Sequence, residues 1–196
     1  MPQIAKYLRY GTISQMQVLT GTAKGKKLKV PSSRKVRPTT SRIKKSIFDK
    51  LGNIEGLKVL DLFAGSGNLG IEALSKKALH VTFVEKDRST SRLISENIAN
   101  CGFENNTTVI NSDYQKAVKF LERKNEKFDL IFIDPPYQLF DKVDFADMLK
   151  LSSTVLNSFG TVVMEHDKNI ILDNLDFDLE TRKYGSTNIT FFWSNN

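Results

Sequence analysis

From residue 58 onward, the chain alternates short apolar runs with segments whose apolar residues recur at helical spacing. This pattern predicts strands over residues 59–63, 81–85, 108–111, 128–134 and 160–165, separated by helices over 68–77, 88–100, 114–123 and 145–156. Two β-rich runs, 177–184 and 189–193, flank a Gly185-Ser186 turn and predict a closing hairpin. Repeated strand–helix units indicate an α/β fold with a doubly wound, mostly parallel sheet.

A smaller unit is expected ahead of this domain. Residues 16–20 and 26–30 are strand-like runs around a turn that begins and ends with glycine, which predicts a β-hairpin. A helix should follow Pro38, with Thr39, Thr40 or Ser41 as its cap. Its apolar positions are Ile43, Ile47, Phe48 and Leu51, and its basic ones, expected away from them, are Arg42, Lys44 and Lys45. We therefore divide the chain into a poorly ordered extension (1–15), an N-terminal lobe (16–56) and a main domain (57–196).

The charge of the chain is concentrated in the lobe. The formal net charge is +7, yet residues 16–50 hold 11 Lys/Arg and one acid, whereas residues 58–196 hold 16 Lys/Arg and 20 acids. An uneven distribution of this kind favours a polyanionic partner such as nucleic acid over an ordinary solvated surface. The candidate contacts are Lys24, Lys26, Lys27, Lys29, Arg34, Lys35, Arg37, Arg42, Lys44 and Lys45.

Several classes of protein are disfavoured. Cys101 is the only cysteine, so an intrachain disulfide and a cysteine-based zinc site are excluded, and the two histidines, His80 and His166, make no metal cluster. The chain has no apolar run near the roughly 20 residues of a membrane helix, and its first residues lack a secretory signal. We expect no metal and no membrane, and a reducing cytoplasm fits.

The segment Asp61-Leu62-Phe63-Ala64-Gly65-Ser66-Gly67 follows an apolar strand and precedes a helix. Glycines at this junction let the backbone turn tightly and approach a ligand closely. Because Gly70 completes a GxGxxG pattern, a dinucleotide-binding fold is the first alternative. However, the Asp61 carboxylate would lie near a diphosphate, whereas it suits the ammonium group of S-adenosylmethionine, which has no phosphate.

Two further acids follow neighbouring strands. Glu85 comes 18 residues after Gly67, a spacing that suits a carboxylate accepting both ribose hydroxyls, although an ordinary exposed glutamate is the alternative. Ser112-Asp113 would contact the adenine amine, but Asp113 is also a good cap for the helix that begins at Tyr114.

Asp134-Pro135-Pro136-Tyr137 ends the apolar strand 128–134. Alone it could be a simple turn, but together with the glycine segment it indicates chemistry on the exocyclic amine of a flat base. Asp134 and the Pro135 carbonyl could accept the two amine hydrogens, which directs the nitrogen lone pair at a methyl donor. Tyr137 could stack on a base that is unpaired or flipped out.

These motifs resemble those of the bacterial 16S ribosomal RNA guanine-N2 methyltransferases. The resemblance runs from about Met16 to Trp193 and rests on DLFAGSGNLGIEALSKKA, VTFVEKD and IFIDPPY, preceded by GTAKGKKLKVPSSRKVRPTTSRIKKSIFDKL. It implies a class I S-adenosylmethionine-dependent methyltransferase with a Rossmann-like, seven-stranded sheet and a small basic N-terminal extension. Its expected substrate is one guanine of small-subunit ribosomal RNA, in an assembling or assembled particle.

The resemblance also assigns residues. It places Asp61, Phe63, Gly65, Gly67, Glu85 and Asp113 at the cofactor, and Asp134, Pro135, Pro136 and Tyr137 at the base. RNA contacts are expected from Lys24, Lys26, Lys27, Arg34, Arg37, Thr39 and Arg42. Where relatives usually have an Arg-Glu pair, this chain has Lys44-Lys45, and residues 1–15 have no counterpart in the family.

Two other functions remain open. The first is a DNA adenine or cytosine amino-methyltransferase, although no 60–100-residue target-recognition insertion is visible. The second is a non-catalytic ribosome assembly factor that keeps the fold, against which the intact DPPY stands.

Overall fold

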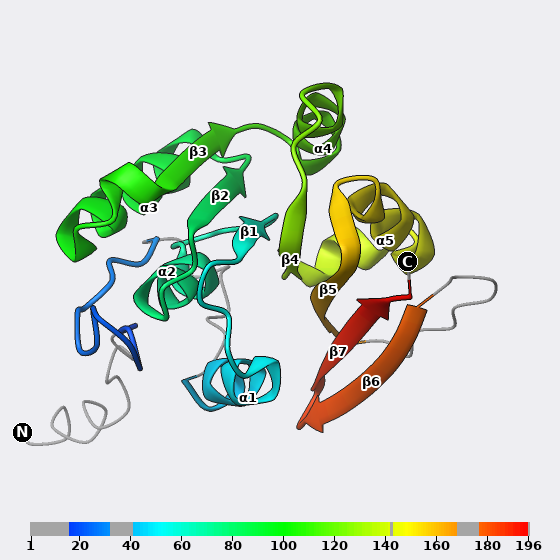
Figure 1. Cartoon of the computed structure of the whole chain (residues 1–196), viewed down its shortest axis with the longest axis horizontal. Coiled ribbons are helices and arrows are strands. Elements are labelled where there is room, and N and C mark those ends of the chain that lie inside the picture. Colours follow the sequence, from blue (N-terminus) through cyan, green and yellow to red (C-terminus); the bar gives the residue numbers. More distant parts are fainter. Residues whose placement is uncertain (1–15, 32–40, 142, 168–176, 196) are drawn as a thin grey trace, which may run out of the picture.

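A seven-stranded sheet forms the centre of the computed structural model, which describes residues 16–31, 41–141, 143–167 and 177–195, apart from the side chains of Tyr137 and Phe140. The strand order is β3-β2-β1-β4-β5-β7-β6 (Figure 1). β1 to β5 are parallel, and β7 is antiparallel to both β5 and β6. The strands are β1 (Lys58–Asp61), β2 (His80–Glu85), β3 (Thr107–Asn111), β4 (Phe128–Ile133), β5 (Leu156–His166), β6 (Phe177–Tyr184) and β7 (Thr187–Ser194).

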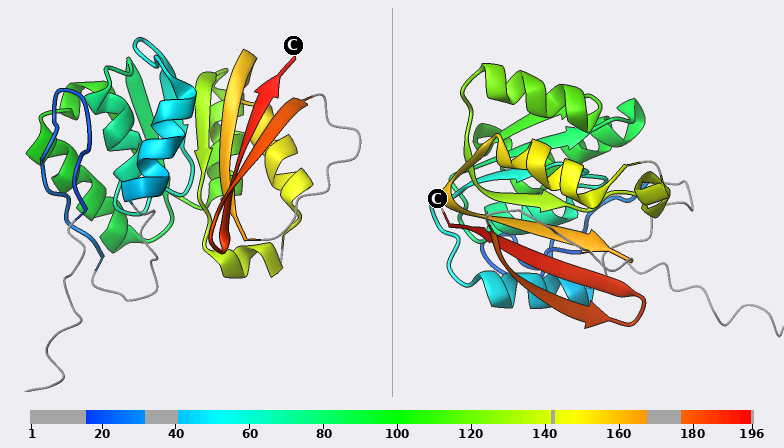
Figure 2. Two further views of the ribbon diagram at one scale, coloured as in Figure 1. Left: turned by 90° about the horizontal axis from the view of Figure 1, so that it is seen from below. Right: turned by 90° about the vertical axis from the view of Figure 1, so that its right-hand side faces the viewer.

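Helices cover both faces of this sheet. They are α1 (Ser41–Leu51), α2 (Asn68–Ser75), α3 (Arg88–Cys101), α4 (Tyr114–Arg123) and α5 (Phe145–Ser153), with short 3₁₀ turns at Glu104–Asn106 and Tyr137–Asp141. One core cluster joins the sheet to α1, α2, α3 and residues 16–31, which we call the N-terminal segment. The other cluster joins the sheet to α4 and α5. Figure 2 shows α1 and α5 on opposite sides of the sheet. The mostly parallel α/β fold predicted from the sequence is confirmed.

The central strand β4 shows why an unbroken apolar run was needed. Phe132 faces the first core cluster and packs against Phe48 of α1, with ring centroids 5.8 Å apart. Its neighbours Ile131 and Ile133 face the second cluster. Both faces of the strand are therefore buried, which is usual for parallel sheets covered by helices. Full burial of each such side chain contributes about 1.5–3 kcal/mol.

The predicted hairpin is present in a reduced form. Residues 16–31 double back through a single antiparallel bridge, Gln17 to Lys27, supported by Val18 N–H donating to the Lys26 carbonyl at 2.9 Å. Other polar groups of this segment bond to α2 and α3 instead of extending the ladder. The segment is thus a loop held down on the main domain.

Candidate active site

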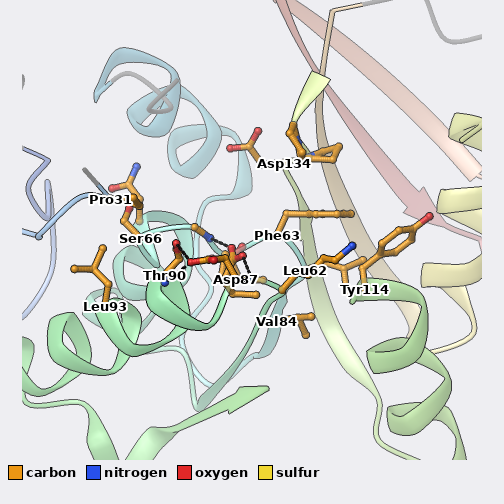
Figure 3. Close-up of a pocket in the computed structure, with 18 of the residues that line it drawn as sticks. Pro31, Leu62, Phe63, Ser66, Val84, Asp87, Thr90, Leu93, Tyr114 and Asp134 are labelled. Atoms are coloured by element: carbon orange, nitrogen blue, oxygen red, sulfur yellow. Dashed lines mark hydrogen bonds between the residues drawn. The ribbon is translucent and has the colours of Figure 1, made fainter. Parts of the chain in front are cut away.

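A cavity of about 1150 Å³ opens at the carboxyl ends of β1, β2, β4 and β5. The sheet order reverses between β1 and β4, which is where ligands bind in doubly wound folds. Asp61, Glu85, Asp113 and Asp134 all line this cavity, so the structure brings together acids that lie far apart in the sequence. Figure 3 shows Asp134 on one side and Asp87 with Thr90 on another.

Residues 61–66 of the glycine segment line the cavity, whereas Gly67 is not among the lining residues. Gly67 begins α2 with φ of 80°, a left-handed conformation that glycine adopts without strain. A Cβ on Gly65 would meet no atom within 4 Å, so the absent side chain leaves room for a ligand beside the backbone. A Cβ on Gly70 would lie 2.3 Å from the Phe83 ring, so this glycine is needed for α2 to pack on β2.

Asp61 is the most deeply buried acid that lines the cavity, with 2% of its surface exposed. One carboxylate oxygen accepts the Gly70 N–H at 3.0 Å. Burial raises the pKa of Asp61 to about 7; the negative charge of Glu85 adds to this, and the Gly70 hydrogen bond opposes it. A buried carboxylate of this kind gains most from a cationic ligand that restores its charged form.

Glu85 links the loop after β1 to the loop after β2, and both loops line the cavity. One carboxylate oxygen accepts the Gly65 N–H at 3.0 Å and the other accepts the Asp87 N–H at 2.8 Å. Burial raises the pKa of Glu85, while these hydrogen bonds lower it. Since a carboxylate can accept about four hydrogen bonds, both oxygens keep capacity for hydroxyl donors.

Asp113 has the capping role that the sequence left open. Its Oδ1 accepts the Gln115 N–H at 3.0 Å at the start of α4, and its Oδ2 lies 3.7 Å from the ammonium of Lys86. Phe63 packs against Tyr114 with ring centroids 5.0 Å apart, and both rings line the cavity. A flat base has aromatic walls here with Asp113 beside them, so the capping and adenine-binding roles are compatible.

The second motif lies at the end of β4, the strand next to β1, where Phe132 pairs with Asp61. Asp134, Pro135 and Pro136 directly follow β4 and line the cavity, Asp134 partly exposed and Pro135 buried. The side chain of Tyr137, expected to stack on the base, lies outside the described part of the chain. The structure therefore places the expected amine-binding groups beside the expected cofactor groups.

Met16, Val30 and Pro31 of the N-terminal segment line one side of the same cavity. Pro31 lies near Ser66 (Figure 3). The Ser66 hydroxyl donates to the Met16 sulfur at 3.1 Å. The buried amide of Asn97 accepts the Lys29 N–H at 2.8 Å and donates to the carbonyls of Lys29 and Ser66, each at 2.9 Å. Sequence reasoning treated this segment only as an RNA contact.

The expected RNA contacts are only partly visible. Lys24, Lys26 and Lys27 are exposed on the N-terminal segment, and Arg42 is exposed on α1. Arg34, Arg37 and Thr39 lie outside the described residues, as do residues 1–15. The exposed amines are available to a polyanion, and their contact with RNA stays a prediction.

The expectation that Lys44 faces away from the apolar stripe is wrong. Its side chain is 2% exposed, and its ammonium donates to the Gln17 carbonyl and to Asn68 Oδ1, each at 2.8 Å. Glu72 lies 2.8 Å from the same ammonium. Lys44 precedes Phe48 by one helical turn and so shares its face, a signal that was present in the sequence. Lys45 is exposed, as expected, and pairs with Asp49.

The residues that line the cavity fit the cofactor expected from the sequence. The acids along the cavity suit an ammonium group and ribose hydroxyls, the apolar and aromatic side chains suit a base, and the open space at Gly65 suits close backbone contact. Among the described residues, no group of His, Cys, Asp and Glu could hold a metal ion, and no helix is long and apolar enough to cross a membrane.

Comparison with known proteins decides the family. The model for the family described as "Conserved hypothetical protein 95" matches residues 16–193. The chain belongs to this family. The Bacillus subtilis protein named "Putative rRNA methyltransferase YlbH" is 34% identical over 187 residues, 90% of this chain and 98% of the relative. The Escherichia coli "Ribosomal RNA small subunit methyltransferase D" is 39% identical over 125 residues, 63% of this chain and 61% of the relative.

Solved structures give the same fold. The Escherichia coli structure described as "Putative methyltransferase yhhF" superposes with a TM-score of 0.78 at 29% identity, covering 92% of this chain and 98% of that one. A Streptococcus mutans structure described as "A putative sam-dependent methyltransferase" reaches a TM-score of 0.65 at 16% identity, covering 81% of this chain and 50% of that one. This protein thus has the fold of the S-adenosylmethionine-dependent methyltransferases.

Two acids of the cavity, Asp87 and Glu165, were not singled out from the sequence. Glu165 lies near the carboxyl end of β5, is 8% exposed and lines the cavity together with Asp134. Its sequence context, Val163-Met164-Glu165-His166, shows a strand end but none of the glycine or proline punctuation that marked the other motifs. Only the pairing of β4 with β5 shows that it belongs to the site.

Proposed function

We propose that this protein transfers the methyl group of S-adenosylmethionine to the exocyclic N2 of a guanine in small-subunit ribosomal RNA. Its methyltransferase class follows from the family, the fold and the rRNA methyltransferases among its relatives. The choice of N2 is supported by one observation: Asp134 and Pro135 line the same cavity as Asp61 and Glu85.

The residues of the chain divide the work between two neighbouring parts of the cavity. Asp61 and Glu85 bind and orient the cofactor, which supplies an electrophilic methyl group when bound. In the part next to β4, Asp134 and the Pro135 carbonyl accept the two amine hydrogens and aim the lone pair of N2. After transfer, N2 carries one proton too many, and the Asp134 carboxylate can accept it.

Substrate binding is assigned to the basic N-terminal lobe. Lys24, Lys26 and Lys27 are exposed on the N-terminal segment. Met16, Val30 and Pro31 of the same segment line the cavity. RNA held by these amines would be held next to the reaction site. We propose an assembling or assembled subunit as the substrate, in the cytoplasm where ribosomes are built.

The test compares acceptors side by side. Tritium transfer from labelled S-adenosylmethionine is measured with small subunits from a strain lacking this gene, naked ribosomal RNA and DNA, and the products are digested for nucleoside mass spectrometry. We expect N2-methylguanosine from a ribosomal acceptor. Label in DNA as methyladenine or methylcytosine would instead identify a DNA amino-methyltransferase. No transfer to any acceptor, with subunit assembly impaired in the strain, would identify an assembly factor.

A further inference from the structure

Two carboxylates lie at neighbouring positions at the ends of the adjacent strands β4 and β5. Ile133 of β4 pairs with Met164 of β5 in the parallel ladder. Asp134 and Glu165 are the residues that come next after this pair. Both line the cavity, and Glu165 is only 8% exposed. Adjacent strands lie about 4.8 Å apart, so the two acids leave the sheet as near neighbours.

The position of Glu165 is fixed by two partner strands. β5 lies between β4 and β7, where Glu165 pairs with Ile189, a fully buried residue. Glu165 also interacts within the chain, and a carboxylate can accept about four hydrogen bonds in all. A strand position with little exposure is suited to recognition, because sites on strands hold their side chains more precisely than sites on loops.

The edges of the bases differ in the group beside the amine. In guanine, N1–H is a donor directly next to the N2 amine, whereas adenine and cytosine carry an acceptor nitrogen next to theirs. An ionised carboxylate can only accept hydrogen bonds. It therefore attracts the guanine edge and opposes the lone pair on adenine N1 or cytosine N3.

We propose that Glu165 is the specificity-determining residue of the base pocket and accepts the N1–H of guanine while Asp134 accepts from N2. This inference rests on the proposed function and extends it, since it explains why the amine acted on is that of guanine. Sites built to hydrogen-bond a substrate N–H reject an analogue lacking it by about 10⁴–10⁵ at the upper end. Because Asp134 is partly exposed, water can reach this part of the pocket, and we expect a smaller figure here.

The test uses 2-aminopurine, which keeps the reactive amine but has an unprotonated N1. Once the methylated position has been mapped, small subunits are reconstituted with RNA carrying guanosine or 2-aminopurine riboside there. The ratio of kcat/KM for the two substrates is measured for the wild type, Glu165→Gln and the exposed control Glu122→Gln on α4. We expect a preference for guanosine of about 10²-fold or more in the wild type and the control. In Glu165→Gln it should fall to within about tenfold, because the glutamine amide can rotate and donate to the N1 of 2-aminopurine.

A binding measurement separates specificity from damage to the fold. In the presence of S-adenosylhomocysteine, the ratio of Kd values for the two RNAs should narrow in Glu165→Gln, while calorimetric affinity for S-adenosylhomocysteine and the Tm stay close to the wild type. An unchanged preference in Glu165→Gln would overturn the inference, and so would a wild type that does not distinguish the two RNAs, even if the variant fails to fold. Failure of the wild type to methylate guanosine would instead overturn the proposed function.

Discussion

The ammonium of Lys44 lies 2.8 Å from the carboxylate of Glu72, and both side chains are almost completely buried. Glu72 also accepts the backbone N–H groups of Leu19 at 2.8 Å and Thr20 at 2.7 Å. This pair therefore ties α1 and the N-terminal segment to α2, the helix that begins at the glycine segment. Burial lowers the pKa of Lys44, and the neighbouring Glu72 charge opposes that shift.

Lys44→Met should destabilise the protein strongly, because it leaves the Glu72 carboxylate buried without a cation. Breaking such a pair from one side costs about 3–5 kcal/mol. Urea unfolding measures the loss, with Lys45→Met as the matched control, because the Lys45–Asp49 pair is exposed and contributes at most about 0.5 kcal/mol. Lys44→Met/Glu72→Gln should recover part of the loss, since the buried charge is gone and the amide carbonyl still accepts. A Lys44→Met protein as stable as the control would show that the pair is not a structural link.

Asp61→Asn should weaken binding of S-adenosylmethionine and S-adenosylhomocysteine and at the same time stabilise the free protein. The folded pKa of Asp61, about 7, is raised above its ordinary value of 3.8. The stability that this carboxyl contributes is therefore fully present below the lower pKa and is lost as the pH rises through the upper one. The stability advantage of Asp61→Asn should appear between these pKa values and be complete above about pH 7. Calorimetry and unfolding curves at several pH values test both effects; an advantage that grows toward acid pH would contradict the assignment.

Asp134→Ala should abolish methyl transfer and leave cofactor affinity nearly intact. Asp134 lies at the end of β4, whereas the expected cofactor groups lie on the Asp61 and Glu85 side of the cavity. Isothermal calorimetry with S-adenosylhomocysteine and tritium transfer under saturating RNA measure the two properties separately. Parallel loss of binding and transfer would remove Asp134 from the base pocket.

Asn97→Ala should reduce cofactor affinity several-fold although the residue does not line the cavity. It removes the link between Lys29 and Ser66 and leaves three backbone groups without that partner, at a cost of about 1–3 kcal/mol for each group that stays unsatisfied. Asn100→Ala is the control, because Asn100 bonds only to the Lys27 carbonyl among the described contacts, in an exposed position. Equal affinities in the two variants would show that the N-terminal wall does not contribute to binding.

Replacing Lys26 and Lys27 by glutamine should weaken RNA binding and reduce the slope of log K against log salt concentration by up to about 0.7–0.9 per lost phosphate contact. The exposed Lys116 and Lys119 of α4, which covers the opposite face of the sheet from α1, provide a charge-matched control pair. Filter binding across a salt series measures both. An unchanged slope in the Lys26/Lys27 variant would exclude these amines from the RNA footprint.

The helices and strands could be predicted from the sequence because their signals are local. Apolar runs such as residues 128–134 and the cap at Asp113 depend on neighbours within a few positions, and α4 has the predicted bounds, Tyr114–Arg123. The glycine segment and DPPY were recognisable for the same reason, since backbone turns at strand ends demand particular residues nearby. The sequence by itself thus determined the fold class and the two halves of the candidate site.

Only the tertiary structure decided which distant residues complete that site. Lysine is usually found at the surface. The burial of Lys44 depends on Glu72, 28 positions away, which neutralises its charge in the core. Asn97 and Glu165 gain their roles through the packing of α3 on residues 16–31 and the pairing of β5 with β4. The spacing of Lys44 from Phe48 indicates its helix face, but the partners of Lys44, Asn97 and Glu165 are set by long-range packing of elements, and spacing along the chain does not identify them.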